Sequence, residues 1–399
     1  MKTIFLLLIC FLVFINYCNS TPQIALQTAN RCINCHLSES GSGLRNENGW
    51  RTVGKYSLIK PEWIGLENLF DMTRLTNSAL DGKLYFGGDV RAQFSRSLKP
   101  ESKRRFFVKQ ITGYGSYEAA DWLYLEGGYN FADITYKNHG QQSWTAGIVL
   151  DPFPETPKVR IGHIQPGFGV RYDDHTMLIR IIASDNVYAN PLIAVDFSDY
   201  GIELYKDVFS PTPEWILNLS GGIFNSSNLS KVKVNSIEGP ISLTGRSNIT
   251  YVLKALLSET IGMSDFTNSY IGASILNSAD FYLINTFFGI NFFKRVSVIF
   301  EYSSGKKADI FSLNNFLCML NIKVFDALYL EIRAEQAQSD FKSLEIKNTS
   351  QQLVFASQIF ILPFIELKQE FRLIDTEQMP REFTQYKGAL YYLQLHLFY

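Results

Sequence analysis

Apolar and polar residues alternate with a period of two in many short segments between Lys83 and Tyr399. The alternation is clearest in Phe364–Leu373, where one face carries Ile365, Leu367, Phe371 and Leu373 and the other carries Glu366, Lys368, Glu370 and Arg372. This period is typical of β-strands with two different faces. A soluble sheet would turn the charged face to water, whereas a transmembrane barrel turns the apolar face to lipid and the charged face to a wet lumen.

Three features favour the transmembrane barrel. Beyond the first twenty residues, no stretch approaches the roughly 18 consecutive apolar residues of a spanning helix. Short connectors such as Phe325–Ala327 alternate with long polar ones, as a barrel with both termini in the periplasm requires. The long ones are Gln165–Asp199, Asn225–Arg246, Gln336–Ser350 and Asp375–Lys387. The chain also ends inside an alternating segment, on the aromatic residue Tyr399, which suits an interfacial girdle.

The alternating segments number about sixteen, a porin-like size. They begin near Leu84, Arg105, Trp122, Trp144, Lys158, Tyr200, Trp215, Asn248, Asn268, Phe281, Val296, Asn315, Leu328, Gln352, Phe364 and Ala389. We therefore predict an all-β fold, with residues 83–399 forming a barrel in the bacterial outer membrane.

Residues Met1–Ser20 have the layout of a secretory signal peptide: a charged start at Lys2, an apolar run and a small residue at the exit. Cys18 raises the alternative of lipid attachment, but the bulky Tyr17 precedes it. We expect export, with Thr21 as the first mature residue.

The exported chain begins with a haem-attachment motif, Cys32-Ile33-Asn34-Cys35-His36. In C-x-x-C-H the two thiols bind the haem vinyl groups, and the next imidazole reaches the iron as proximal ligand. A redox dithiol would require a βαβ context, and a zinc site would require a second ligand pair nearby. We therefore predict one covalent haem c in a short α-helical cytochrome segment, residues 21–60.

The sixth iron ligand is not evident within that segment, because residues 21–60 contain no methionine and no histidine other than His36. Met72, His163 and His175 are the candidates for this distal position, and each could equally be an ordinary core, loop or lumen residue. Residues 61–82 are expected to be a linker, with an amphipathic helix over Pro61–Leu80.

The haem segment is too small to form a sizeable core of its own. The simplest architecture places it inside the barrel or against the periplasmic mouth. A free periplasmic cytochrome tethered to an unrelated pore is the alternative.

The sequence resembles the fused cytochrome-porin family of outer-membrane electron carriers, best known among ferrous-iron oxidisers. The resemblance rests on Pro22 and Ala25 ahead of the haem motif and on Asn48–Tyr56 after it. This chain has a longer insert, Leu37–Asn46, and lacks an aromatic residue just before Gly49. The resemblance implies electron passage through one haem, as in an oxidoreductase of the ferrous iron:cytochrome c type.

Three functions remain open at this point. The first is electron transfer between an extracellular donor or acceptor, such as iron, and a periplasmic carrier such as a soluble cytochrome. The second is a porin for solutes with a haem-bearing plug or gate. The third is a soluble secreted cytochrome with a β-rich binding domain. The near-balanced charge, 37 Lys and Arg against 38 Asp and Glu, gives no field for nucleic acid.

One further stretch, Arg160–Met177, concentrates glycine and charged residues where a strand enters a long connector. It could fold into the lumen as a constriction, or it could be a surface loop, which the same residue types favour. Within it, Asp173, Asp174 and His175 could also bind a metal, although adjacent side chains seldom converge on one ion.

Overall fold

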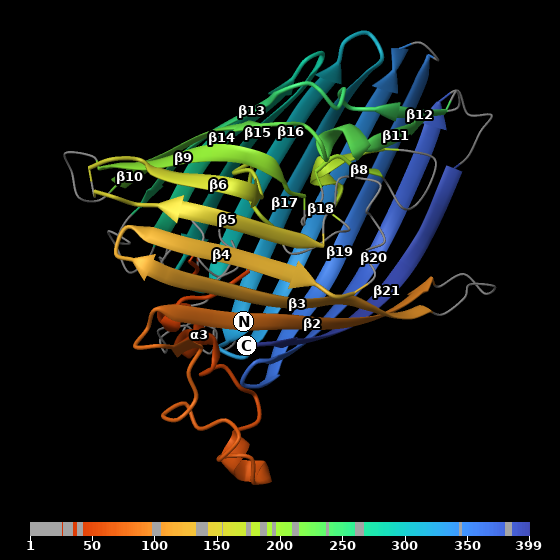
Figure 1. The fold of residues 1–399 in the computed structure, drawn as a ribbon. Coiled ribbons are helices and arrows are strands. Elements are labelled where there is room, and N and C mark those ends of the chain that lie inside the picture. Colours follow the sequence, from red (N-terminus) through yellow and green to blue (C-terminus); the bar gives the residue numbers. More distant parts are fainter. Residues whose placement is uncertain are drawn as a thin grey trace.

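A single antiparallel β-sheet that closes on itself dominates the computed structural model (Figure 1). The structure describes residues 26, 35–37, 43–97, 105–132, 143–153, 155–172, 177–183, 190–193, 197–209, 215–236, 239–259, 267–342, 345–379 and 385–399. The sheet has seventeen strands, of which β1 (Ser78–Ala79) is a two-residue addition to β2. The other sixteen form the barrel, which the pairing of β2 with β21 closes. The predicted all-β barrel of sixteen strands is confirmed.

The barrel strands follow one another around the wall in chain order. They are β2 (Leu84–Ser97), β3 (Arg105–Ala120), β4 (Leu123–Asn130), β5 (Trp144–Leu150), β6 (Lys158–Ile164), β9 (Asp199–Phe209), β10 (Trp215–Phe224), β13 (Thr250–Glu259), β14 (Thr267–Ser278), β15 (Phe281–Phe292), β16 (Val296–Lys307), β17 (Phe311–Phe325), β18 (Leu328–Phe341), β19 (Ile346–Leu362), β20 (Ile365–Met379) and β21 (Gln385–Phe398).

The two faces of each strand separate as the alternation predicts. In β20, Phe371 and Leu373 are exposed on the outer face, whereas Arg372 between them is buried on the inner face. In β18, Leu330 and Ile332 are likewise exposed. Apolar side chains on the outside and charged ones inside are the arrangement of a barrel in lipid. The protein is therefore an outer-membrane barrel, and its inner face surrounds the lumen.

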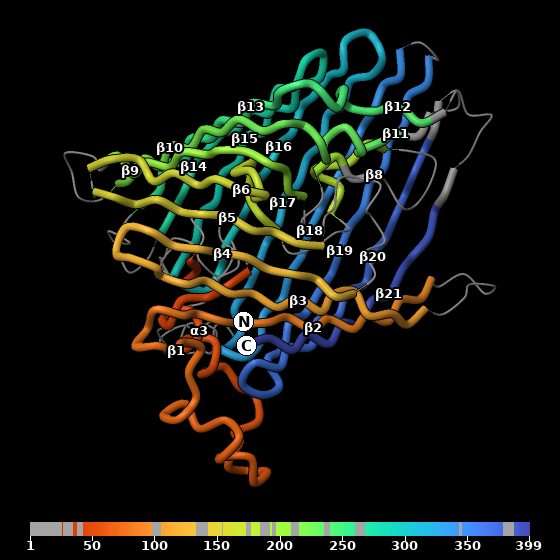
Figure 2. The backbone as a smooth tube through the Cα atoms, in the orientation of Figure 1, coloured from red at the N-terminus to blue at the C-terminus, as the bar shows by residue number. Residues whose placement is uncertain are grey.

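The two rims differ in their connectors. The longest, residues 165–198 and 225–249, lie on one rim, and both ends of the barrel sequence, at Leu84 and Phe398, lie on the other. Figure 2 shows the N-terminal segment and the C-terminus side by side at this second rim. Since barrels of this kind keep both termini in the periplasm, the rim at Leu84 is periplasmic and the opposite rim is extracellular.

Two of the predicted long loops are mostly strand. Residues 336–341 of β18 pair with residues 346–351 of β19, within the expected loop Gln336–Ser350. The expected loop Asp375–Lys387 likewise contains strand pairing: residues 375–377 of β20 pair with residues 385–387 of β21. At the extracellular rim the outer faces of these hairpins carry polar residues such as Gln338 and Gln351, and apolar residues such as Phe341 and Ile346 face inward. The pattern of apolar outside and polar inside that marks the lower part of each strand is therefore lost there.

The predicted helix over Pro61–Leu80 is wrong. The structure has only a four-residue 3-10 helix there, η2 (Pro61–Ile64), followed by turns and β1. Pro61 can start the helix because it needs no N–H partner, and Gly65 ends it in the left-handed conformation, with φ of 70°. In the described part of the chain, no helix is long and apolar enough to cross a membrane.

Candidate functional site in the barrel lumen

Cys35 and His36 are the described residues of the predicted haem motif, and Cys32 lies outside the described residues. Both are buried, with 1% and 3% of their surfaces exposed. His36 forms an antiparallel β-bridge with Arg45, and the Asn46 N–H donates to the Cys35 carbonyl oxygen at 3.1 Å. Cys35 and His36 thus lie in a turn and a bridge, folded back against the residues that follow them. The α-helix predicted for this segment is not seen at these two positions.

The helix α3 (Glu47–Val53) follows directly and packs against the motif. Asn46 caps it, because its side-chain oxygen accepts a hydrogen bond from the Gly49 N–H at 2.9 Å. A Cβ at Gly49 would lie 2.1 Å from the Cys35 carbonyl oxygen, so only glycine allows this approach. The glycine of the Asn48–Tyr56 run therefore has a packing role beside Cys35.

Helix α3 docks on the periplasmic rim of the barrel through Trp50. The Trp50 ring stacks on Phe364, with centroids 5.3 Å apart, and meets Tyr399 edge-on at 5.5 Å. These rings belong to a buried group that we call the periplasmic cluster: Trp50, Val53, Tyr56, Ala327, Tyr329, Phe360, Phe364 and Phe398. The segment from α3 to Tyr56 therefore packs against the barrel rim and is not a freely tethered domain.

Leu26, the described residue ahead of the motif, lies in the lumen. Leu26 is 1% exposed, and the side-chain amide of Asn268 donates to its carbonyl oxygen at 3.0 Å. A Cβ at Gly289 would lie 2.7 Å from the Leu26 side chain. Leu26 belongs to the lumen cluster, which comprises Leu26, Val170, Tyr172, Met177, Ile179, Phe287, Ile299, Leu317 and Met319. Leu26 before the haem motif thus contacts the barrel from within, and Trp50 after the motif contacts it at the periplasmic mouth.

The side chains around the motif fit a c-type haem. Cys35 and His36 supply a buried thiol and a buried imidazole. Among the described residues, two neighbouring buried donors find no acceptor, the Trp50 Nε1–H and the Arg45 Nε–H. Since a buried donor without an acceptor costs about 1–3 kcal/mol, these two suit a bound anionic group, and haem carries two propionates.

Of the distal-ligand candidates, Met72 lies nearest to α3. A Cβ at Gly54, which ends α3, would lie 2.3 Å from the Met72 Cε, and Met72 packs on the periplasmic cluster. His175 lies outside the described residues.

His163 lies at the extracellular end of β6, away from the periplasmic mouth. Its Nε2 is 3.0 Å from the Asn228 amide nitrogen, and its ring lies 4.1 Å from that of Trp144. The structure therefore does not bring His163 to His36. Nor do the described residues contain any cluster of three His, Cys, Asp or Glu side chains that could hold a metal ion.

A further histidine of the sequence, His396, is buried beside the periplasmic cluster. His396 is bonded on both ring nitrogens, to Asp89 at 2.8 Å and to Glu366 at 3.0 Å. Its ring also contacts Phe398, over which the Arg45 guanidinium lies at 4.7 Å. The signal was present in the sequence, because the alternation puts Glu366 and His396 on lumen-facing positions of adjacent strands.

Charged residues continue along the lumen wall formed by β18 to β20. Arg333 is fully buried between Glu331 and Glu335, at 2.7 Å and 2.5 Å. Gln352 adds a hydrogen bond to Glu335 at 2.8 Å. The predicted charged interior is confirmed, and its charges are paired with one another.

The described parts of the connector 165–198 fold into the lumen. Near its start, the Gly167 N–H donates to Glu203 at 2.7 Å, and further on Asn315 of β17 donates to the Ile181 carbonyl oxygen at 2.7 Å. Its described elements are η4 (Leu178–Arg180), β7 (Ile181–Ile182) and β8 (Asn190–Pro191).

The described residues of Arg160–Met177 that follow β6 therefore lie in the lumen and do not form a surface loop. That they act as a constriction stays a prediction. The reason for the inward position is tertiary: apolar residues beyond this stretch, such as Ile182 with no exposed surface, draw the connector inward. Arg180 then pairs with Glu301 of β16 at 3.0 Å across the lumen. Asp173 and Asp174, like His175, lie outside the described residues.

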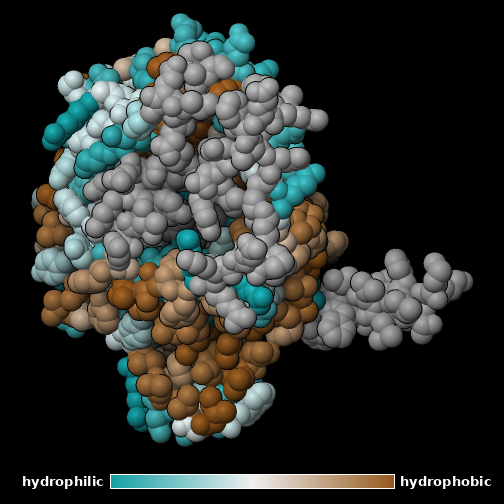
Figure 3. Space-filling model, turned by 90° about the vertical axis from the view of Figure 1, so that its right-hand side faces the viewer, coloured by the Kyte–Doolittle hydropathy of each residue, from teal (hydrophilic) through white to brown (hydrophobic). Residues whose placement is uncertain are grey.

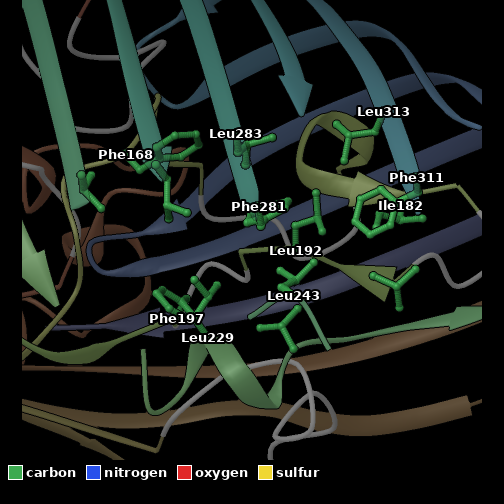
Figure 4. Packing of buried hydrophobic residues seen from close by; sticks show 14 of the residues in the cluster. Phe168, Ile182, Leu192, Phe197, Leu229, Leu243, Phe281, Leu283, Phe311 and Leu313 are labelled. Atoms are coloured by element: carbon green, nitrogen blue, oxygen red, sulfur yellow. The ribbon is translucent and has the colours of Figure 1, made fainter. Parts of the chain in front are cut away.

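An apolar core lies inside the extracellular mouth, against strands between β6 and β19. Side chains from 165–198 and from 225–249, which contains η5 (Leu229–Lys231), β11 (Lys233–Ser236) and β12 (Gly239–Ser242), meet inward-facing strand residues there. Figure 4 shows Phe168, Leu192, Leu229 and Leu243 of the connectors close to Phe281, Leu283, Phe311 and Leu313 of the strands. This extracellular cluster comprises Ile164, Phe168, Ile182, Leu192, Phe197, Phe224, Leu229, Val232, Val234, Leu243, Val252, Leu276, Phe281, Leu283, Phe311, Leu313, Phe341 and Ile346.

The barrel is similar in fold to known outer-membrane proteins. Pseudomonas putida OprB, in a high-pH structure, has 10% sequence identity and a TM-score of 0.51 over 90% of this chain and 99% of that chain. Salmonella typhi OmpF, in complex with daunomycin, has 11% identity and a TM-score of 0.50 over 81% of this chain and all of that chain. At such identity the likeness shows the fold alone. No protein-family model and no curated protein matches the sequence.

The fold and the lumen together define the class of protein. It is a bacterial outer-membrane barrel of sixteen strands with a porin-like fold. In this chain, described parts of two connectors pack inside the extracellular mouth, and α3 docks on the periplasmic rim.

Proposed function

We propose that this barrel binds one haem c through Cys32, Cys35 and His36 and moves single electrons between the cell exterior and a periplasmic carrier. The observation that carries the proposal is the packing of Cys35 and His36. Both are buried, and the helix that follows them is docked on the barrel rim. A redox group attached there would have a fixed position relative to the barrel.

When bound, haem c supplies reversible one-electron chemistry, and the chain supplies position and environment. The two cysteines would hold the porphyrin, and His36 would be the proximal ligand. Trp50 and Arg45 offer N–H donors to anionic groups. The periplasmic cluster keeps water away from one side of the segment. Met72, which packs beside α3, stays a candidate for the distal position.

A solute channel with a haem-bearing plug is the second candidate, and the porin-like fold favours it. Barrels of sixteen strands leave an aqueous channel when their lumen is open. The extracellular cluster argues against a wide open path, because it places apolar side chains from two connectors inside that mouth. We therefore place electron transfer first.

The partners of the proposed activity follow from the family resemblance. Ferrous iron is the extracellular donor that it favours, and a soluble periplasmic cytochrome is the acceptor. The protein would then act as an oxidoreductase of the ferrous iron:cytochrome c type. Outward flow to a mineral or another cell uses the same residues.

Reconstitution into sealed liposomes that enclose an oxidised soluble cytochrome c tests the proposal. External ferrous iron should reduce the enclosed cytochrome, and a Cys32→Ser/Cys35→Ser variant should not do so. Release of an enclosed small sugar by the wild-type protein, without reduction of the cytochrome, would favour the solute channel. A sealed barrel that passes no electrons from ferrous iron or from a reduced external dye would contradict both candidates.

A further inference from the structure

Residues 57–70 leave the barrel rim and return to it, and we call them the periplasmic lobe. At its first end, the Leu58 and Ile59 N–H groups donate to the carbonyl oxygens of Phe360 and Ile361 in β19, at 2.8 Å and 3.1 Å. At its second end, Phe70 packs on the periplasmic cluster. Figure 1 shows the lobe projecting below the strands. The lobe is thus attached to the rim at both ends.

Hydrogen-bonded turns hold the tip of the lobe. The Leu66 N–H donates to the Pro61 carbonyl oxygen at 2.9 Å, after the left-handed turn at Gly65. The Phe70 N–H then donates to the Leu66 carbonyl oxygen at 3.3 Å. The backbone therefore presents the side chains of the tip in a defined arrangement.

The tip exposes large apolar side chains. Trp63 is 69% exposed, Leu69 is 62% exposed and Ile64 is 49% exposed. The lysine Lys60 lies over the Trp63 ring, with its Nζ 5.7 Å from the centroid. Apolar side chains grouped in this way on a short segment mark a contact surface, because scattered single residues would need no explanation.

The lobe starts where the lipid-facing surface ends. Its root adjoins the turn between β17 and β18, since the Phe360 N–H donates to the Ala327 carbonyl oxygen at 2.9 Å. That turn exposes Phe325, and the turn before it on the same rim exposes Phe293. Exposed aromatic side chains at this level form the interfacial girdle of a barrel. Figure 3 shows hydrophobic surface extending over the lower part of the molecule towards its lower end.

The chemistry of the tip suits a lipid surface better than a charged protein. Tryptophan and lysine are typical of the membrane interface, where the indole ring has an apolar body and a polar N–H. The lobe carries one lysine, Lys60, and two glutamates, Glu62 and Glu67, so it offers no charged patch to steer a partner.

We propose that the periplasmic lobe is an interfacial anchor, with Trp63, Ile64 and Leu69 inserted among the headgroups of the phospholipid leaflet that faces the periplasm. The anchor fixes the segment between α3 and β2 to the membrane plane. Because Cys35 is packed against α3, the anchor also fixes the height of the periplasmic mouth relative to the bilayer. This role does not depend on whether haem is bound.

Fluorescence quenching in liposomes tests the anchor. The full-length protein and its Trp63→Phe variant are reconstituted in phosphatidylethanolamine–phosphatidylglycerol vesicles, with or without a lipid that carries a quencher near the headgroup. The difference between the two spectra isolates Trp63. We expect its emission to be blue-shifted, quenched by the labelled lipid and largely protected from acrylamide in the buffer.

The opposite pattern would overturn the anchor. Red-shifted Trp63 emission that acrylamide quenches and the labelled lipid does not would place the tip in water. Protection that arises only after a soluble protein is added would show a protein-docking surface instead. As a second measurement, a nitroxide at position 69 in Leu69→Cys should show lipid rather than buffer accessibility, and one at position 67 in Glu67→Cys should be more accessible to the buffer.

Discussion

The Gly49 backbone lies so close to Cys35 that a Cβ at Gly49 would sit 2.1 Å from the Cys35 carbonyl oxygen. The haem motif and α3 are therefore one packed unit. What disturbs this contact should disturb attachment of the haem, even though Gly49 carries no functional group.

Gly49→Ala should separate α3 from the motif. The added methyl group cannot be accommodated by side-chain movement, because the opposing atoms are backbone. We expect the haem content per barrel to fall several-fold, measured by the haem absorbance of protein purified from cells that attach haem. Gly115→Ala is the matched control, since the nearest atom to its Cβ would lie 3.9 Å away. Equal haem content in the two variants would contradict the packing argument.

Two substitutions of Trp50 separate the contribution of its buried N–H donor from the contribution of its ring to packing. Trp50→Phe keeps an aromatic ring but removes the N–H, whereas Trp50→Ala should loosen the segment by about 3–5 kcal/mol through a cavity. Without haem, in a Cys32→Ser/Cys35→Ser background, Trp50→Phe should be nearly neutral, because removal of the unpaired donor offsets the packing that the smaller ring loses. With haem it should destabilise the segment, as measured by proteolysis within 43–56. The same effect with and without haem would exclude a role for this donor in binding an anionic group.

The extracellular cluster should keep the barrel closed to solutes. In planar bilayers we expect the wild-type conductance to be far below that of an open sixteen-stranded porin. Leu243 has no exposed surface, and Leu243→Asp should raise the conductance by placing a charge in the cluster. Ile249→Asp, at a half-exposed position in the same connector, is the control. Large wild-type conductance would show that the connectors leave a solute path.

Arg333 should be the most costly charge to remove from the lumen wall. Arg333→Met would leave Glu331 and Glu335 buried without their cation, which costs about 3–5 kcal/mol. The measurement is the unfolding temperature, taken as the temperature of heating at which the folded band on the gel is replaced by the unfolded band. Lys347→Met, which breaks an exposed pair with Asp340, should cost no more than about 1 kcal/mol. Comparable shifts would mean that the Arg333 pairs are solvated.

The sequence was sufficient for the barrel because each strand repeats a local pattern. The exposed Phe371 and Leu373 on either side of the buried Arg372 were predictable from alternation alone. Helical spacing in Pro61–Leu80 was misleading, because the proline and Gly65 break the chain into turns that docking on the rim stabilises.

The sequence could not decide between a lumenal and a surface position for residues 165–198, since the inward folding depends on contacts with distant strands. The bond between Asn315 and the Ile181 carbonyl oxygen joins residues 134 positions apart. His396 shows a related limit: alternation places it in the lumen, but its two carboxylate partners come from β2 and β20. Such pairings follow from closure of the barrel, which no local pattern encodes.

The intact mass of the mature protein is the most direct test of the central claim. Protein purified in detergent from cells that attach haem should exceed the polypeptide mass by one haem, and His36→Ala should change the absorption spectrum while leaving that mass in place. Cys32→Ser/Cys35→Ser should show the polypeptide mass alone. A wild-type protein with the unmodified mass would contradict the account.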